Sequence, residues 1–133
     1  MSIRVILSFG NALFSAGISK LLEDERDITV EILPSATKCT LDKLESLQPD
    51  AVLVDFIVLF NVFSKTENAK RRIPLILLDT NCGRDNLMSA VLRKKISGVL
   101  PEGSSPALMK KAIRAVANGE IWLDKQMFKE FLY

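Results

Sequence analysis

Three acidic side chains follow apolar runs that have the length of buried strands, and they are the groups of this chain best placed to do chemistry: Asp55, Asp79 and Glu102. The run before Asp55 is continuous from residue 51 to 54 and opens with Pro49-Asp50, which is typical of a strand covered on both faces. The carboxyl ends of such strands are where open α/β sheets build their sites. Carboxylates gathered there could bind a cation or share a proton. Alternatively they only solvate loops, and both interpretations stay open.

Composition excludes several classes of site. The 133 residues suit one domain, 48% of them are hydrophobic, and the net charge of +2 is too small to indicate nucleic acid or an anionic membrane. The chain has no histidine, which excludes histidine bases, ligands and pH switches. Cys39 and Cys82 lie far apart, as expected for reduced thiols in a cytoplasmic protein. No apolar stretch has the length of a membrane span, and the first residues lack a signal-peptide pattern.

Alternating strand and helix patterns must position these acids. Asn11 is placed as a helix N-cap, and Ser105 with Pro106 forms a second strong helix start. The hydrophobic run continues past Asp55 through 56–60 before a weaker helical pattern begins. Strands are predicted at 3–8, 28–33, 49–55, 73–78 and 96–100, and helices at 11–24, 41–47, 62–72, 85–95 and 107–118. In the first helix, six residues at helical spacing are predicted to face the core: Leu13, Phe14, Gly17, Ile18, Leu21 and Leu22.

This alternation predicts the fold class. Five strands separated by helices favour a parallel sheet with helices on both faces, since crossovers between parallel strands are right-handed. At this length we expect a flavodoxin-like, three-layer α/β/α sandwich with strand order 2-1-3-4-5. Residues 1–120 are predicted to form this domain, and 121–133 a C-terminal extension that begins a linker helix.

Several stretches together resemble the receiver domain of two-component response regulators, of the NarL/FixJ type with a LuxR-type output domain. The resemblance covers nearly the whole chain and is most specific in its last third. The matching stretches are Asn11 to Gly17, Pro49 to Asp55, Ser97 to Leu100, Ser105-Pro106, Ala112 to Glu120 and Trp122 to Asp124. The resemblance implies a CheY-like fold and assigns Asp55 the position of the phosphorylated aspartate.

The same resemblance shows which functional positions differ in this chain. The family's acidic pair, which holds Mg²⁺, falls on Phe9 and Gly10. Its Thr/Ser position falls on Asp79, with Thr80 next to it, and its lysine position falls on Glu102. The family's proline four residues after the acceptor is replaced by Leu59.

These differences oppose ordinary phosphorylation. A phosphoryl group on Asp55 would meet Asp79 and Glu102 without Mg²⁺ or a lysine, and such repulsion amounts to several kcal/mol at about 4–6 Å. Asp55 is therefore predicted to be a phosphoacceptor-like residue that is not used conventionally. The chain is expected to be a cytoplasmic pseudo-receiver without Mg²⁺ or enzyme activity. Two alternatives remain: a small-ligand or metal sensor that uses the acidic pocket, and a phosphoacceptor with unusual geometry.

The resemblance also implies partners. We expect a homodimer, or contact with the protein's own output domain, through the fourth and fifth helices and the strand between them, residues 85–118. A histidine kinase is a further candidate partner. DNA would be bound only through a separate helix-turn-helix domain, because these residues contain no DNA-reading element. No membrane contact is predicted.

Overall fold

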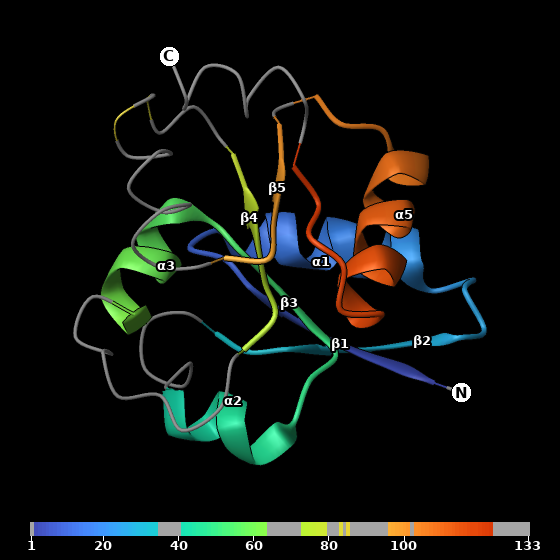
Figure 1. Cartoon of the computed structure of the whole chain (residues 1–133), viewed down its shortest axis with the longest axis horizontal. Coiled ribbons are helices and arrows are strands. Elements are labelled where there is room, and N and C mark those ends of the chain that lie inside the picture. The colour runs from blue at the N-terminus through green and yellow to red at the C-terminus, as the bar shows by residue number, and fades with distance from the viewer. Residues whose placement is uncertain are drawn as a thin grey trace.

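The computed structural model describes residues 2–34, 41–63, 73–79, 83, 85, 96–101 and 103–123. A five-stranded sheet lies at its centre, with the order β2-β1-β3-β4-β5 and every neighbouring pair parallel. The strands are β1 (Ile3–Ser8), β2 (Ile28–Ile32), β3 (Ala51–Val54), β4 (Leu75–Leu78) and β5 (Gly98–Leu100). The predicted topology is therefore confirmed (Figure 1).

Helices cover both faces of this sheet, as the three-layer prediction requires. They are α1 (Ala12–Leu22), α2 (Leu41–Leu47), α3 (Phe56–Phe63) and α5 (Pro106–Ala117). α1 and α5 pack on one face, while α2 and α3 pack on the other (Figure 1). The predicted helix at 85–95 lies outside the described residues, apart from Asp85, which is helical. Within the part of the chain that is described, no helix is long and apolar enough to cross a bilayer.

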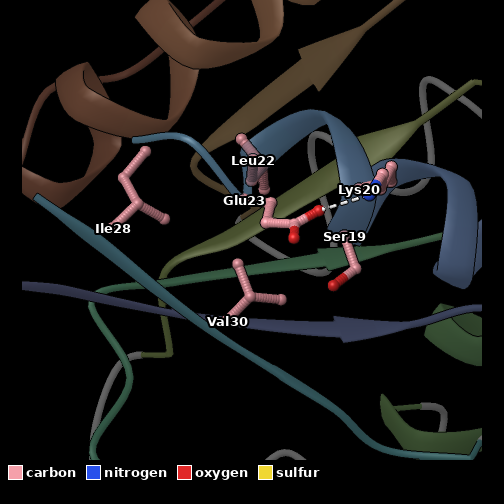
Figure 2. Close-up of a pocket in the computed structure, with 6 residues that line it drawn as sticks. All are labelled: Ser19, Lys20, Leu22, Glu23, Ile28 and Val30. Atoms are coloured by element: carbon pink, nitrogen blue, oxygen red, sulfur yellow. Dashed lines mark ion pairs between the residues drawn. The ribbon is translucent and has the colours of Figure 1, made fainter. Parts of the chain in front are cut away.

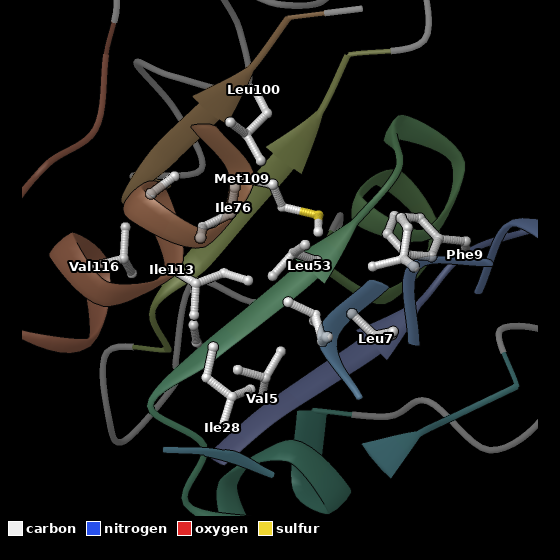
Figure 3. Close-up of a cluster of buried hydrophobic side chains, with 14 residues drawn as sticks. Val5, Leu7, Phe9, Ile28, Leu53, Ile76, Leu100, Met109, Ile113 and Val116 are labelled. Carbon is white, nitrogen blue, oxygen red and sulfur yellow. The ribbon is translucent and has the colours of Figure 1, made fainter. Parts of the chain in front are cut away.

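Alternating residues of the central strands build two buried clusters, one on each face. In β1, Leu7 points to the α1 and α5 side, whereas Ile6 points to the α2 and α3 side. Figure 3 shows the first cluster, where α5 contributes Met109, Ile113 and Val116. Both faces of the sheet are thus sealed by apolar contacts, and its loops are left to carry polar groups.

Helix caps were predicted better than helix faces. The Asn11 Oδ1 accepts the Leu13 N–H at 2.9 Å, and the Ser105 Oγ accepts the Leu108 N–H at 3.1 Å. The predicted inner face of α1, however, is wrong in part. Ile18 and Leu22 are buried, and Ser15 is buried with them.

The other four residues of that predicted stripe are exposed, although the Phe14 ring also contacts Phe9: Leu13, Phe14, Gly17 and Leu21. Leu13 is 84% exposed, and a methyl group added at Gly17 would meet nothing within 4 Å. Both sets of residues recur at helical spacing, so periodicity could not decide which set faces the sheet. A glycine inside a helix costs about 0.5–1 kcal/mol relative to alanine, and no contact within the described structure requires it here.

The segment after Asp55 also differs from its prediction. The sequence suggested a hydrophobic run that continues to residue 60, with a helix at 62–72, but α3 already begins at Phe56. Val58 and Leu59 of this helix are buried, while Ile57 is 62% exposed. Residues 64–72 lie outside the described part of the chain.

The end of the described chain is attached to the edge of the sheet. The Trp122 N–H donates to the Ser97 carbonyl at 2.8 Å, and the Val99 N–H donates to the Trp122 carbonyl at 2.9 Å. A methyl group at Gly98 would come within 3.1 Å of the Trp122 Cβ. Residues 121–123, the start of the predicted C-terminal extension 121–133, therefore pack with the sheet, and the rest of that extension lies outside the described residues.

Candidate functional site at the carboxyl ends of the central strands

Asp55 follows the last residue of β3 and is held at the middle of the sheet. Its Oδ2 accepts the Gly10 N–H at 2.8 Å, and its Oδ1 accepts the Val58 N–H at 2.8 Å. The first bond joins the carboxylate to the loop between β1 and α1, and the second caps the start of α3. Both carboxylate oxygens are therefore engaged by backbone amides.

The second bond makes Asp55 the N-cap of α3. Its carbonyl oxygen accepts the Leu59 N–H at 3.0 Å, which closes the first turn of that helix. Aspartate is among the best N-cap residues because its side chain satisfies an amide that the helix leaves free. This explains why a segment rich in β-branched and aromatic residues, which are poor helix formers, begins a helix immediately after the strand.

Gly10 lies directly against Asp55. A methyl group added at Gly10 would lie 3.4 Å from the Asp55 Oδ2. The resemblance places one of the family's acidic residues at this position, so the structure confirms that position 10 adjoins the acceptor position. Glycine provides only a backbone amide there, and it offers no oxygen to a cation from a side chain.

Phe9 turns away from solvent into the core. Its side chain is buried in the cluster on the α1 and α5 face, next to Leu7 and Leu53 (Figure 3). It also meets the Phe14 ring edge to face, with the ring centroids 5.0 Å apart. The other position of the acidic pair is thus occupied by a core residue, which anchors the first loop by apolar packing.

The remaining predicted acids are described only in part. Asp79 follows β4, the neighbour of β3, and its N–H donates to the Leu100 carbonyl at 2.9 Å. Asp79 and Asp55 therefore leave adjacent strands at the same edge. Thr80 and Glu102 lie outside the described residues, so their predicted places in the pocket stay predictions.

The donor set does not fit the Mg²⁺ site of the receiver family. Mg²⁺ needs oxygen ligands in near-octahedral geometry, whereas positions 9 and 10 provide none from side chains and the Asp55 oxygens accept amides. Among the residues that the structure describes, no group of three or more acidic or cysteine side chains is arranged to hold a metal ion.

A hollow of about 250 Å³ lies elsewhere, between α1 and the edge strand β2 (Figure 2). Its walls are Ser19, Lys20, Leu22, Glu23, Ile28 and Val30, and Figure 2 shows Lys20 paired with Glu23 on α1. None of the predicted pocket residues lines it. The hollow is formed by α1 and β2 alone, and the Asp55 site does not extend to it.

A second polar cluster, which the sequence analysis did not predict, lies at the opposite end of the strands, near their amino termini. The Arg114 side chain donates to both Asp27 carboxylate oxygens, from Nε at 3.0 Å and from Nη2 at 2.9 Å. Lys110 pairs with Glu25 at 2.9 Å, and Arg114 pairs with Glu25 at 3.1 Å. The signal that could have found it is the i, i+4 spacing of the two cations on one helix.

These ion pairs shift the pKa values of the side chains in the cluster. The pKa of Glu25 is lowered by its hydrogen bond from Lys110 and then by that from Arg114. The pKa of Asp27 is lowered mainly by its hydrogen bonds from Arg114, and the pKa of Arg114 is raised mainly by Asp27. The cluster joins α5 to the loop between α1 and β2, far along the strands from Asp55.

Comparison with known proteins bears on the fold. No protein-family model matches the sequence, and no curated protein matches it. Solved structures do match. A LuxR-family two-component response regulator from Aurantimonas sp. SI85-9A1 is 16% identical over 99% of this chain and 96% of its own, with a TM-score of 0.72.

Two further matches are of the same kind. The signal receiver domain of the putative response regulator NarL from Mycobacterium tuberculosis is 19% identical over 90% of this chain and 98% of its own, with a TM-score of 0.69. The Salmonella typhimurium response regulator RcsB, described for its dynamism in DNA interaction, is 19% identical over 98% of this chain and 67% of its own, with a TM-score of 0.70. The chain therefore has the fold of response-regulator receiver domains, as the sequence resemblance predicted.

Proposed function

We propose that this chain is a receiver-type regulatory domain that works without Mg²⁺-dependent phosphorylation of Asp55 and without enzyme activity. The observation that carries the proposal is the engagement of both Asp55 carboxylate oxygens by the Gly10 and Val58 amides. In an ordinary receiver the corresponding carboxylate must attack a phosphoryl group beside a bound metal ion. Here the carboxylate closes a loop and caps a helix.

The cost of phosphorylation at this place supports the proposal. An acyl phosphate forms through one carboxylate oxygen, and that oxygen then becomes a poor hydrogen-bond acceptor. Phosphorylation of Asp55 would therefore release either the Gly10 amide or the Val58 amide. A hydrogen bond to a charged group is worth about 1.5–3 kcal/mol, and the sequence provides no metal ligand at positions 9 and 10 to offset its loss.

The regulatory role would then depend on protein contacts. Several solved structures with this fold are response regulators. One of them, RcsB, is described for DNA interaction, and the match covers only 67% of the RcsB chain. By analogy we place this domain in the cytoplasm, with DNA bound only through a separate output domain. α5 remains the proposed contact for such a domain, since it forms part of the predicted surface at 85–118.

The test is exposure to acetyl phosphate. The full chain and the Asp55→Asn variant are incubated with acetyl phosphate and Mg²⁺, then analysed by intact-mass spectrometry and on phosphate-affinity gels. We expect no phosphorylated species in either protein, while a conventional receiver treated in parallel becomes modified. A stable adduct on the wild-type chain that is absent from the Asp55→Asn variant would overturn the proposal.

A further inference from the structure

The side of β2 that faces away from β1, here called the free side, carries backbone groups that could bind another strand. Among the described strands, β2 pairs with β1 alone. The Asp27 carbonyl accepts the Ile3 N–H at 2.6 Å, and the Leu33 N–H donates to the Leu7 carbonyl at 2.9 Å. Backbone groups of successive residues point to opposite sides of a strand, so those of residues 29 and 31 also face β1. The residues between them direct their N–H and C=O groups to the free side: Ile28, Val30 and Ile32.

Two of these three residues keep their amides unbonded. The Ile28 N–H donates to the Glu25 carbonyl at 3.2 Å, whereas the Val30 and Ile32 N–H groups have no acceptor in the described part of the chain. Ile32 is also 41% exposed, although its side chain is apolar. An edge of this kind is a template for another strand, and the surface beside it decides which strand fits.

The hollow of about 250 Å³ lies beside this free side, under α1. β2 is the edge strand, no residue of β1 lines the hollow, and the residues of β2 that line it are Ile28 and Val30. Figure 2 shows Ser19 and Glu23 of α1 above Val30 of β2. Every second side chain of a strand added to β2 would point to the α1 face and would enter this hollow. Backbone bonds and a side-chain pocket therefore occur together, as recognition by strand addition requires.

The walls of the hollow favour an apolar side chain. Leu22, Ile28 and Val30 provide its apolar surface. Its two charged groups satisfy each other, because the Lys20 Nζ lies 2.9 Å from the Glu23 Oε2. A charged side chain that entered the hollow would compete with this pair, whereas a valine or leucine side chain would bury its surface against the apolar wall. The residues of the added strand that face α1 are therefore apolar.

The opposite face of β2 favours a cation. Glu31 aligns with Ile6 of β1, which points to the α2 and α3 side, so the Glu31 carboxylate lies on that face. Glu31 is exposed and forms no ion pair with any of the described residues. A lysine or arginine opposite it on an added strand would pair with it. Apolar and basic residues thus alternate in the segment that fits this side.

We propose that the free side of β2 binds an extended segment of a partner protein, in which apolar residues that face α1 alternate with basic residues on the side of Glu31. The segment adds a strand to the sheet, bonds to the Val30 and Ile32 backbone, and places an apolar side chain in the hollow. The inference goes beyond the proposed function. It does not depend on whether Asp55 accepts phosphate, because β1 separates β2 from β3.

A second copy of this chain fits the free side less well. Two β2 strands joined side by side would bring side chains that already line hollows of their own, so both hollows would stay unfilled. The second copy would also bring another Glu31 and no cation within β2, so the acid would stay unpaired. A separate segment with apolar and basic residues satisfies both features.

The probe is the end-capped peptide TVKVKVT, titrated into the full 133-residue chain and followed by NMR of the backbone amides. We expect the Val30 and Ile32 signals to shift, and their hydrogen exchange to slow about tenfold when the peptide is at about ten times its dissociation constant. The Glu31 amide, which faces β1, is the internal control and should keep its exchange rate. Two control peptides should bind more weakly: TVEVEVT, with the opposite charge, and TVVKKVT, without the alternation.

Methylation of chosen peptide amides tests the backbone bonds without changing a side chain. In an antiparallel strand, the residues that face α1 are also those whose N–H groups face β2. N-methylation of the valines should therefore abolish binding, while N-methylation of the lysines should be tolerated. The reverse result would indicate a parallel strand on the same side of β2 and would also support the proposal.

Two pairs of variants test the side-chain contacts. Ser19→Phe fills the hollow and should weaken peptide binding about tenfold or more, whereas Leu21→Phe, on the same helix but outside the hollow, should not. Glu31→Lys should weaken binding of TVKVKVT and strengthen binding of TVEVEVT. Glu120→Lys makes the same change of net charge at an exposed residue outside β2 and should leave both affinities unchanged. Circular dichroism checks that each variant is folded.

Val30 and Ile32 signals that do not change at millimolar peptide would overturn the proposal. Binding that survives both methylations, that is lost with either one, or that neither Ser19→Phe nor Glu31→Lys weakens would contradict it as well. Slow exchange of the Val30 and Ile32 amides without peptide, together with self-association in sedimentation velocity, would show that a second copy occupies the free side. That result would also overturn the proposal.

Discussion

The carboxylates at the two ends of the parallel strands are satisfied in different ways; we call these ends the carboxyl edge and the amino edge of the sheet. At the carboxyl edge, Asp55 is satisfied by two backbone amides. At the amino edge, Glu25 and Asp27 are satisfied by the side chains of Lys110 and Arg114. Amides carry no net charge and do not move with a rotamer, whereas the half-buried cations Lys110 and Arg114 are partly screened by salt. The carboxyl edge is therefore built as a fixed structural joint, although receiver domains place their switch there.

This contrast supports the proposal that the receiver-type fold of this chain works without phosphorylation of Asp55. In the family, a cation and a lysine neutralise charge beside the acceptor. In this chain, the described residues of that edge provide amides and a buried phenylalanine. The loops remain anchored, because Asp55 ties them to α3 and Phe9 packs them into the core. If Asp55 is not phosphorylated, as we propose, signalling would involve other surfaces of the domain.

The largest expected effect comes from removing the Asp55 carboxylate with its two hydrogen bonds. Asp55→Ala deletes the cap of α3 and the tie to Gly10, and it should lower the free energy of unfolding by about 2–3 kcal/mol, from one cap and one charged hydrogen bond. Urea denaturation followed by circular dichroism measures the change. Glu120→Gln, at an exposed carboxylate, is the control and should change stability by less than about 0.5 kcal/mol. An Asp55→Ala variant as stable as wild type would break the contrast between the edges.

The next largest effect distinguishes the two edges by how their contribution to stability depends on pH. Glu25 and Asp27 have lowered pKa values in the folded chain, so the unfolded chain binds more protons and stability falls as the pH drops. The stabilisation is fully present above about pH 5 and is lost as the pH falls through the lowered values. Arg114→Ala should flatten this loss, measured as the melting temperature from pH 7 to pH 3.

Salt and a conservative variant sharpen the same prediction. Arg114→Lys keeps the charge but loses the two-pronged contact with Asp27, so it should fall between wild type and Arg114→Ala. In 1 M NaCl the difference between wild type and Arg114→Ala should shrink, since salt partly screens these half-buried pairs. The effect of Asp55→Ala should stay the same. Equal salt sensitivity at both edges would contradict the account.

The smallest expected effect tests a polar group that the carboxyl edge leaves unsatisfied. Ser8, the last residue of β1, is fully buried, and within the described structure its hydroxyl has no hydrogen-bond partner. Ser8→Ala should therefore raise the free energy of unfolding by up to about 1 kcal/mol, since it removes a desolvated hydroxyl. Thermal and urea unfolding measure this gain. A clear loss of stability would indicate that the hydroxyl has a partner.

Much of the fold followed from local patterns. Apolar runs bounded by turn residues located all five strands, and the caps at Asn11 and Ser105 located two helices because capping is a local interaction. The face of α1 did not follow, because Leu13 and Ile18 both fit the helical period and only packing on the sheet decides between them. The start of α3 could have been found, since an aspartate before an apolar segment is also an N-cap signal.

For the candidate site, the sequence predicted which residues lie together but only part of how they are bonded. The sequence placed Asp55 at the end of a strand and put Gly10 in the family's metal-binding position, and the structure brings these two residues together. The bond from the Val58 amide is a local N-cap and could have been predicted. The bond from the Gly10 amide could not, because it joins the carboxylate to the backbone of another segment and a backbone amide carries no sequence signature. The Arg114 cluster was missed for a related reason, since it joins residues 87 positions apart.

The most direct test of the structural role of Asp55 is amide hydrogen exchange followed by NMR. We predict that the Gly10 and Val58 amides are protected in the wild-type chain, and that both exchange about tenfold faster or more in Asp55→Ala. The Leu13 amide, which Asn11 caps, should keep its protection and serves as the internal control. Fast exchange of Gly10 and Val58 in the wild-type chain, or exchange that Asp55→Ala leaves unchanged, would contradict the account.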